Sequence, residues 1–218
     1  MKRTLFVIAS LAWAVSVMYA AVSYSDELKP IKLPNPQVDG GGPLMQVLKD
    51  RSSSRSFSPE KLSAQVLSNL LWAAFGINRP DTGKRTAPSA VNRQEIDIYV
   101  ASADGLYLYE AKSQGLKLIM SDDIRALTGR QDFVKEAPVN LIYVADFSRM
   151  GNTPKEDKEL YSAADTGFIS QNVYLYCASE RLATVVRGSV DKQTLAKTMK
   201  LRRDQKIILT QSVGYPKK

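Results

Sequence analysis

A strongly apolar segment from Val139 to Asp146 constrains the fold of this chain more than any other feature. Its charged flanks and lack of polar alternation predict a central strand that is buried on both faces. The longest predicted helix, Leu160 to Arg181, follows it and is apolar nearly all round, so we expect it to be buried on several sides. Such a helix lies in the centre of a core or at a dimer interface, and the two are compatible.

The other predicted elements are distributed over residues 43 to 216. Helices are predicted at 43–49, 63–75, 122–127, 131–136 and 191–199, and strands at 96–101, 106–111, 116–120, 184–187 and 207–214. Ser63 is a candidate N-cap and Gly76 a candidate terminator of the second helix. Residues 77–94 predict a long loop without regular structure. There are no internal repeats, and 218 residues fit one medium domain.

The chain contains no histidine and one cysteine. The absence of histidine excludes the Ser-His-Asp triad, the Cys-His pair and the usual zinc and haem ligand sets. Cys177 cannot form an internal disulfide and lies in an apolar helical run, so we interpret it as a small buried hydrophobic residue, with a reactive thiol as the alternative. If the protein is an enzyme, a cofactor is expected to carry the chemistry.

Residues 1–23 have the pattern of a secretory signal peptide. Lys2 and Arg3 precede an apolar run that ends in small residues, and the run is short for a membrane span. We therefore predict an exported, periplasmic protein, which contacts the membrane only if this segment is an uncleaved anchor. Residues 24–42, rich in Pro, Asp and Gly, predict an extended arm.

The protein remains basic after loss of the signal, with 28 basic against 22 acidic residues and a net charge of +6. This charge favours anionic ligands or an anionic surface. Nucleic acid is not an expected partner, because the charges are dispersed and no nucleic-acid-binding motif is present.

Two arginines and three serines are concentrated in the five residues from Arg51 to Arg55. Such a group of guanidinium and hydroxyl donors suits a phosphate monoester. Arg51, Ser52, Ser53 and Arg55 are therefore candidate phosphate-binding residues at the end of a predicted helix. Taken alone, the segment can equally be a solvated polar loop.

A second polar segment, Pro88 to Asn92, follows within the predicted long loop. It can supply a tight backbone turn and an amide side chain, which suit a planar, hydrogen-bonding ring; the alternative is an ordinary turn, since Pro-Ser is a common loop opening. Pro88, Ser89, Ala90 and Asn92 are the candidate residues. Together the two segments predict a nucleotide-like cofactor with a phosphate at one end.

In this order, the two segments resemble the flavin mononucleotide (FMN) signature of the nitroreductase superfamily, Arg-x-Ser-x-Arg/Lys followed by Pro-Ser-Ser/Ala-x-Asn-x-Gln. Three later segments continue the similarity over residues 43 to 216: Ala137-Pro138, Thr166-Gly167-x-x-x-Gln171-Asn172 and Gly214-Tyr215-Pro216. The stretch from Gly83 to Ala87 is similar to the branch that includes flavin-dependent azoline dehydrogenases.

The resemblance implies an α+β fold with a mixed, mostly antiparallel sheet flanked by helices, in an obligate homodimer that binds FMN at the subunit interface. The FMN-binding domain would span residues 43–218. Arg51, Ser53 and Arg55 of one subunit would hold the phosphate, while the segment from Pro88 to Asn92 of the other would frame the isoalloxazine ring.

The resemblance also implies a role for Val186, Arg187 and Gly188, the family position whose backbone amide donates to the N5 region of the flavin. A donor there stabilises negative charge on the reduced ring. A carboxylate often stands where this chain has Arg187, so the nicotinamide-binding environment is expected to differ. Gln131, with Arg130 beside it, would lie at the ribityl or pyrimidine end.

Many members of the family extend past the Gly-Tyr-Pro segment with a further Lys or Arg for the phosphate. Here Lys217 and Lys218 take that role, or the phosphate relies on the first segment alone.

These features predict an FMN-dependent oxidoreductase that passes hydride through flavin N5 to a small electrophilic acceptor in a ping-pong scheme. The electron donor is NAD(P)H or, because NAD(P)H is scarce outside the cytoplasm, a redox protein docked on the basic surface. Two alternatives stay open. They are an exported FMN-binding protein without turnover, and an exported α+β interaction module whose Arg51–Arg55 loop is solvated.

Overall fold

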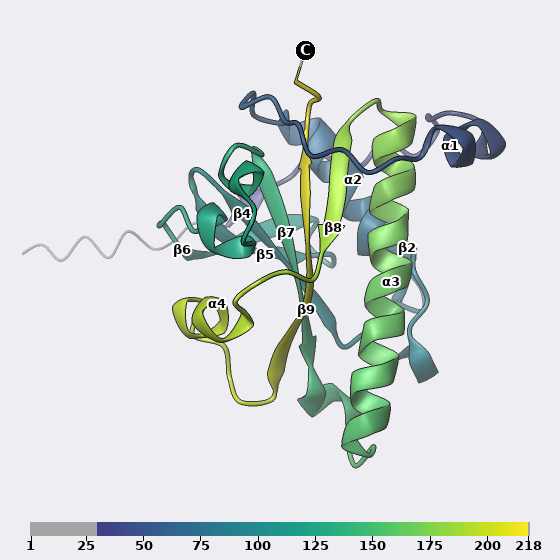
Figure 1. The fold of residues 1–218 in the computed structure, drawn as a ribbon. Helices are drawn as coiled ribbons and strands as arrows, with labels where there is room; N and C mark the ends of the chain where they lie inside the picture. The colour runs from purple at the N-terminus through teal and green to yellow at the C-terminus, as the bar shows by residue number, and fades with distance from the viewer. Residues whose placement is uncertain (1–29, 218) are drawn as a thin grey trace, which may run out of the picture.

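The computed structural model describes residues 30–217, in which seven strands form one sheet in the order β1-β6-β5-β4-β7-β9-β8 (Figure 1). Every neighbouring pair in this sheet is antiparallel. The strands are β1 (Ile31–Lys32), β4 (Ile96–Ser102), β5 (Gly105–Glu110), β6 (Gly115–Met120), β7 (Val139–Asp146), β8 (Ala183–Arg187) and β9 (Gln205–Gly214). The helices are α1 (Leu44–Asp50), α2 (Ala64–Phe75), α3 (Lys155–Ser179) and α4 (Lys192–Thr198). The predicted α+β fold with a mostly antiparallel sheet is confirmed.

Strand β7 lies in the middle of the sheet, between β4 and β9, and all of its residues are buried. Leu141 and Tyr143 pack into the cluster that contains α2 and α3, whereas Ile142 and Val144 pack into the cluster that contains α4. Because both faces of the strand are covered, most positions on both faces are apolar, and the buried Asn140 is hydrogen-bonded within the core. This explains the strongly apolar sequence and confirms the predicted central strand.

Helices α2 and α3 pack together on one face of the sheet. Helix α2 begins where the sequence predicts, because the Ser63 side chain accepts a hydrogen bond from the amide of Val66. Helix α3 begins at Lys155, five residues before the predicted start. Pro154 precedes it, and Glu156 and Asp157 in its first turn stabilise the positive end of the helix dipole, so the polar residues before Leu160 are also helical.

Residues 77–94 differ from the prediction of a loop without regular structure. They contain a hairpin of β2 (Ile77–Arg79) and β3 (Lys84–Arg85), followed by the 3₁₀ turn η1 (Ala90–Asn92). The Arg79 guanidinium donates to the carbonyl of Arg85 at 2.6 Å, which supports this hairpin with a side chain. Strands this short carry no apolar alternation, so the pattern could not reveal them.

Three further 3₁₀ turns are η2 (Arg125–Thr128), η3 (Asp132–Lys135) and η4 (Phe147–Met150). The first two replace the helices predicted at 122–127 and 131–136. Each is four residues long, too short for a stable α-helix.

The described part of the predicted arm is not a simple linker. Ile31 and Lys32 pair with β6 as an edge strand, and Leu33 is buried in the core. The predicted signal peptide at 1–23 and residues 24–29 lie outside the described residues. Within residues 30–217, no helix is long and apolar enough to cross a membrane.

The turn between β4 and β5 requires glycine at position 105. Gly105 has φ of +134°, and a Cβ there would lie 2.5 Å from the carbonyl oxygen of Met120. We expect Gly105→Ala to lower the free energy of unfolding by roughly 1–3 kcal/mol, measured by urea denaturation at a fixed protein concentration. Gly40→Ala is the control, because a Cβ at Gly40 meets no atom within 4 Å; it should change stability by less than about 0.5 kcal/mol. Equal effects of the two substitutions would contradict this account.

Candidate functional site

The Arg51–Arg55 segment lies between helix α3 and strand β8. The Arg51 guanidinium stacks 5.4 Å from the centroid of the Tyr174 ring, and the Ser53 and Tyr174 hydroxyls are 2.9 Å apart. The amide of Ser54 donates to the carbonyl of Thr184 on β8, also at 2.9 Å. Helix α1 ends at Asp50, so the Arg51–Arg55 segment begins directly after its C-terminus.

The residues of this segment point to two sides. Arg51 and Ser53 contact Tyr174, whereas Ser52 and Ser54 line a groove of about 430 Å³ together with Arg181. Arg55 is exposed, and no hydrogen bond or ion pair in the described residues fixes the direction of its side chain. Ser52 is separated from Arg51 and Ser53.

Tyr174 is a residue of this site that the sequence analysis assigned only to packing. Its hydroxyl contacts Ser53 and also accepts a hydrogen bond from the amide of Val186 at 2.9 Å. A tyrosine within a helix predicted to be buried needs a hydrogen-bond partner for its hydroxyl. This requirement could have identified Tyr174 from the sequence.

The segment Val186–Gly188 is brought close to the first motif through Tyr174, but the Arg187 side chain turns away from any open cleft. It is 5% exposed, and its guanidinium donates to the Thr128 carbonyl, the Asn140 amide oxygen and the Ser212 hydroxyl, each at 3.0 Å. Burial lowers the pKa of Arg187 to about 10. The Arg187 side chain is therefore part of the core rather than of an open cleft.

The Pro88–Asn92 segment forms a pre-organised turn. The Ala90 amide donates to Asp165 Oδ2 of α3 at 2.9 Å, and the Ser89 hydroxyl accepts from the Gln94 amide at 2.9 Å. Val91 and Asn92 have φ of +54° and +55°. Val91 is also 84% exposed, and a β-branched residue with positive φ is strained, a condition that clusters at functional sites.

Gln131 lies at the start of η3, next to the end of β8. The Arg130 amide donates to the Ser189 carbonyl at 3.1 Å, which links the two segments. The Oε1 atom of Gln131 is buried and has no hydrogen-bond partner in residues 30–217. Nη1 of Arg93, just after the second motif, is also buried without a partner in the described chain. One acceptor and one donor are thus left for a group from outside the chain.

The two motifs do not meet within one chain. Both contact α3, the first at Tyr174 and the second at Asp165. Nine residues of α-helix correspond to about 13 Å along the axis. A ligand that touches both motifs must span that distance, or the second motif must come from another copy of the chain.

Glu95 and Asp165 form a buried pair of carboxyl groups under the second motif. They are 0% and 2% exposed, and neither Glu95 oxygen has a hydrogen-bond donor in the described residues. Burial, and after it the nearby Asp165, raises the pKa of Glu95. Burial thus favours the protonated form of Glu95, while Asp165 accepts a hydrogen bond from the amide of Ala90.

The single thiol takes no part in this site. Cys177 is completely buried, and burial raises its pKa well above the usual range of a thiol. This confirms the prediction of a small buried hydrophobic residue rather than a reactive thiol.

Comparisons with known proteins identify relatives of the whole described domain. The model of the Nitroreductase family matches residues 48–215. A protein of Methanocaldococcus jannaschii, provisionally named a nitroreductase, is 29% identical over 169 residues, which are 73% of this chain and 85% of that protein. The crystal structure of a provisionally named nitroreductase from Ralstonia eutropha has a TM-score of 0.83 and 44% identity, covering 87% of this chain and 90% of that one. A structure from Desulfovibrio desulfuricans in complex with FMN shares the fold, with a TM-score of 0.60 and 22% identity over 82% of this chain and 89% of that one.

The raised pKa of Glu95 predicts a pH-dependent stability that Glu95→Gln removes. When a carboxyl has a higher pKa in the folded than in the unfolded protein, the free energy of unfolding falls as the pH rises. The fall begins at the pKa of the unfolded state, about 4.3, and ends at the pKa of the folded state. We expect Glu95→Gln to match the wild type near pH 4. Above that pH the variant should gain about 1.4 kcal/mol for each pH unit between the two pKa values. Urea denaturation from pH 4 to 8 measures this difference. The exposed Glu60→Gln is the control, and identical profiles for both variants would contradict the assignment.

Proposed function

This chain belongs to the nitroreductase family, and from that membership we propose that it is an FMN-dependent oxidoreductase acting on a small electrophilic acceptor. Membership of this family supports the general assignment of the chain as a flavin-dependent oxidoreductase. The observation that favours FMN is the placement of Arg51 and Ser53 together at Tyr174, with the exposed Arg55 two residues further along the chain. Two guanidiniums and a hydroxyl in so short a segment suit a terminal phosphate monoester.

The remaining candidates fit the rest of a flavin. The buried Oε1 of Gln131 and Nη1 of Arg93 are an acceptor and a donor without partners in the described chain, as a pyrimidine edge requires. The strained turn at Val91 presents backbone and the Asn92 amide. When bound, FMN supplies the two-electron chemistry, and the residues of the chain bind, orient and shield it.

We also propose that the active form is a homodimer. Apolar side chains remain exposed on one chain at α1 (Leu44, Met45, Leu48), on α3 (Leu160, Tyr161, Phe168) and at Val91 of the second motif. An apolar surface of this kind is typical of a protein interface. A two-fold dimer over α3 would supply the second motif of one copy to the first motif of the other, which overcomes the separation of the two along the helix.

The proposed electron donor is NAD(P)H or a redox protein. If residues 1–23 direct export to the periplasm, a redox protein is favoured, and the net charge of +6 after loss of the signal would attract an acidic one. The proposed acceptor is a small electrophilic molecule.

Flavin retention tests the proposed function. We expect the double variant Arg51→Ala and Arg55→Ala to lower FMN affinity on the order of 100-fold or more, because each charge-assisted hydrogen bond contributes about 1.5–3 kcal/mol. The measurements are the visible absorption of freshly purified protein and a titration of flavin fluorescence. Arg203→Ala, at an exposed position in the turn before β9, is the control and should retain the wild-type affinity. A wild-type protein that stays colourless after incubation with FMN would refute the proposal.

Light scattering after size-exclusion chromatography tests the dimer. Phe168→Glu places a charge on an exposed apolar position of α3 and is expected to give a monomer with reduced flavin content. Leu127→Glu, at an exposed apolar position on η2, is the matched control and should remain dimeric. A Phe168→Glu protein that stays dimeric with full flavin content would exclude this interface.

A further inference from the structure

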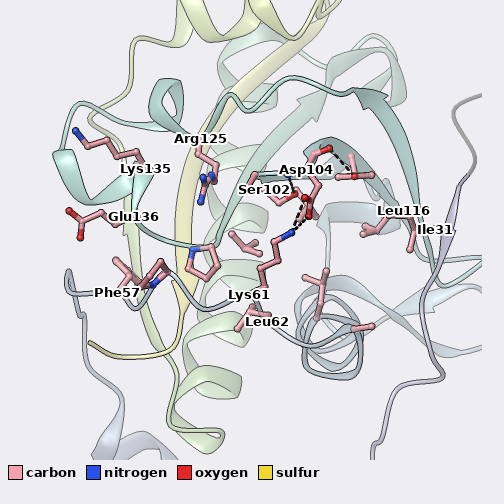
Figure 2. A pocket seen from close by; sticks show the side chains of 18 of the residues that line it. Ile31, Phe57, Lys61, Leu62, Ser102, Asp104, Leu116, Arg125, Lys135 and Glu136 are labelled. Atoms are coloured by element: carbon pink, nitrogen blue, oxygen red, sulfur yellow. Dashed lines mark hydrogen bonds and ion pairs between the residues drawn. The ribbon is translucent and has the colours of Figure 1, made fainter. Parts of the chain in front are cut away.

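A cavity of about 640 Å³ lies against the sheet and is lined by residues of β1, β4, β5, β6 and β7 (Figure 2). It opens between the segment before α2, strand β1 and the turn that joins β4 to β5. The cavity is within the size range of small-molecule sites. The Arg51–Arg55 and Pro88–Asn92 segments do not line it, and of the predicted phosphate contacts only Lys217, the alternative at the C-terminus, does.

The interior of the cavity is apolar. Its walls include Leu33, Phe57, Val100, Leu116 and Val139, all of them buried core residues. These side chains come from five different elements or loops, so the walls are held by the core itself. Such a surface favours an apolar body of a ligand.

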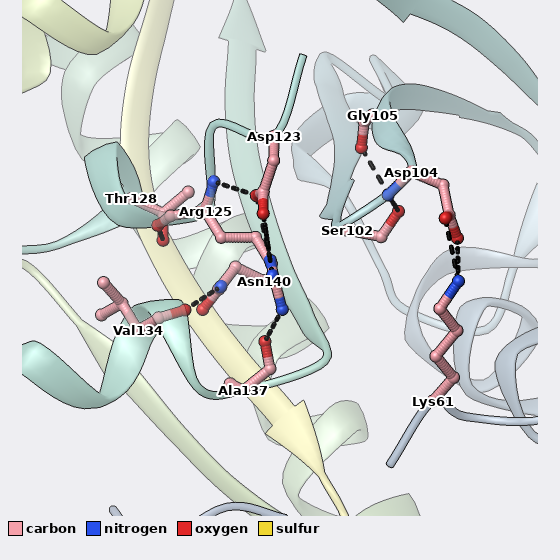
Figure 3. A network of polar contacts seen from close by, with 10 residues as sticks. All are labelled: Lys61, Ser102, Asp104, Gly105, Asp123, Arg125, Thr128, Val134, Ala137 and Asn140. Atoms are coloured by element: carbon pink, nitrogen blue, oxygen red, sulfur yellow. Dashed lines mark hydrogen bonds and ion pairs between the residues drawn. The ribbon is translucent and has the colours of Figure 1, made fainter. Parts of the chain in front are cut away.

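The mouth of the cavity is charged. Lys61 reaches across to Asp104, with both carboxylate oxygens 2.8 Å from Nζ, as Figures 2 and 3 show. The side chains of this pair are 69% and 60% exposed. An ion pair so exposed contributes little to stability and can exchange partners with a ligand carboxylate.

Arg125 provides the second cation at the mouth. Its guanidinium is bound to Asp123 and to the carbonyl of Ala137 (Figure 3). These contacts use three of the five N–H donors of an arginine, so two remain. Because Asp123 and Ala137 fix the side chain, which is 16% exposed, those donors are pre-organised.

The charges around the mouth favour an anion with a single charge. Four cationic side chains line the cavity, namely Lys61, Arg125, Lys135 and Lys217. Asp104 and Glu136 line it as well, and Asp123 neutralises Arg125 from outside. The balance is one excess positive charge, which a carboxylate matches. A dianionic phosphate would exceed it and face Asp104 and Glu136.

We propose that this cavity is a second binding site, which takes an amphipathic monocarboxylate. The apolar body lies against Phe57, Leu116 and Val139, and the carboxylate replaces Asp104 at Lys61 and meets the remaining donors of Arg125. The site is complete within one chain and does not depend on the proposed flavin function.

Titration with decanoate, followed calorimetrically on the full-length protein, tests the proposal. We expect saturable one-to-one binding with Kd below about 1 mM, and weaker binding of uncharged decanol. Ala64→Phe, at a residue that lines the cavity, is expected to abolish binding by filling the space. Lys49→Met, on α1 outside the cavity, is the charge control and should leave the affinity unchanged.

Two charge variants separate ligand binding from a structural role of the ion pair. Lys61→Met removes the cation and should weaken decanoate binding about tenfold, whereas Asp104→Asn removes the competing carboxylate and should strengthen it. A purely structural ion pair would move both affinities in the same direction, and that result would overturn the proposal.

Two other results would also overturn it. One is decanoate and decanol binding equally well. The other is an Ala64→Phe protein with unchanged affinity but an altered oligomeric state, since the cavity would then be covered by a second copy. Flavin content measured on the same samples should be equal in all of these variants, so failure here is distinguishable from failure of the flavin proposal.

Discussion

The hydroxyl of Tyr174 connects the parts of the chain on which the candidate site depends. It accepts a hydrogen bond from the amide of Val186 and shares one with Ser53, while Arg51 covers its ring. Helix α3, which carries Tyr174, is fixed by Ile169 and Val173 in the main core. A buried hydroxyl without partners would cost free energy, so the loop and the strand stay where the core places this side chain. The direction of the phosphate-binding candidates therefore follows from core packing more than from the loop itself.

Helix α3 also sets the separation between the two halves of the site. The first motif lies at Tyr174 and the second at Asp165, about 13 Å apart along the axis. Burial under the second motif favours the protonated form of the Glu95 carboxyl, and the neighbouring Asp165 accepts the hydrogen bond from the Ala90 amide. The strained backbone at Val91 is thus held by groups that belong to the helix and the sheet.

The elements that could be predicted from the sequence are those whose signal is carried by apolar residues or a cap. Strand β7 and helix α2, with its cap at Ser63, are examples. The β2–β3 hairpin depends on a side chain of Arg79 that bonds to the backbone, and no local pattern records such a contact. Arg187 belongs to the predicted flavin-contact segment with Val186 and Gly188, yet its side chain is buried in the core. Its direction is decided by Gly129, since the guanidinium occupies the space that a side chain at Gly129 would need.

Buried polar atoms without partners distinguish the two sites of this molecule. In residues 30–217 they belong to Arg93, Glu95, Gln131, Thr166 and Arg187, which lie beside the second motif, on the middle of α3 or at the end of β8. None of these residues lines the 640 Å³ cavity. Because unpaired buried groups cost free energy, those of Arg93 and Gln131 would gain most from a ligand or a second copy. The cavity has satisfied walls and an exposed ion pair at its mouth, so it can bind and release a ligand without rearrangement of the core.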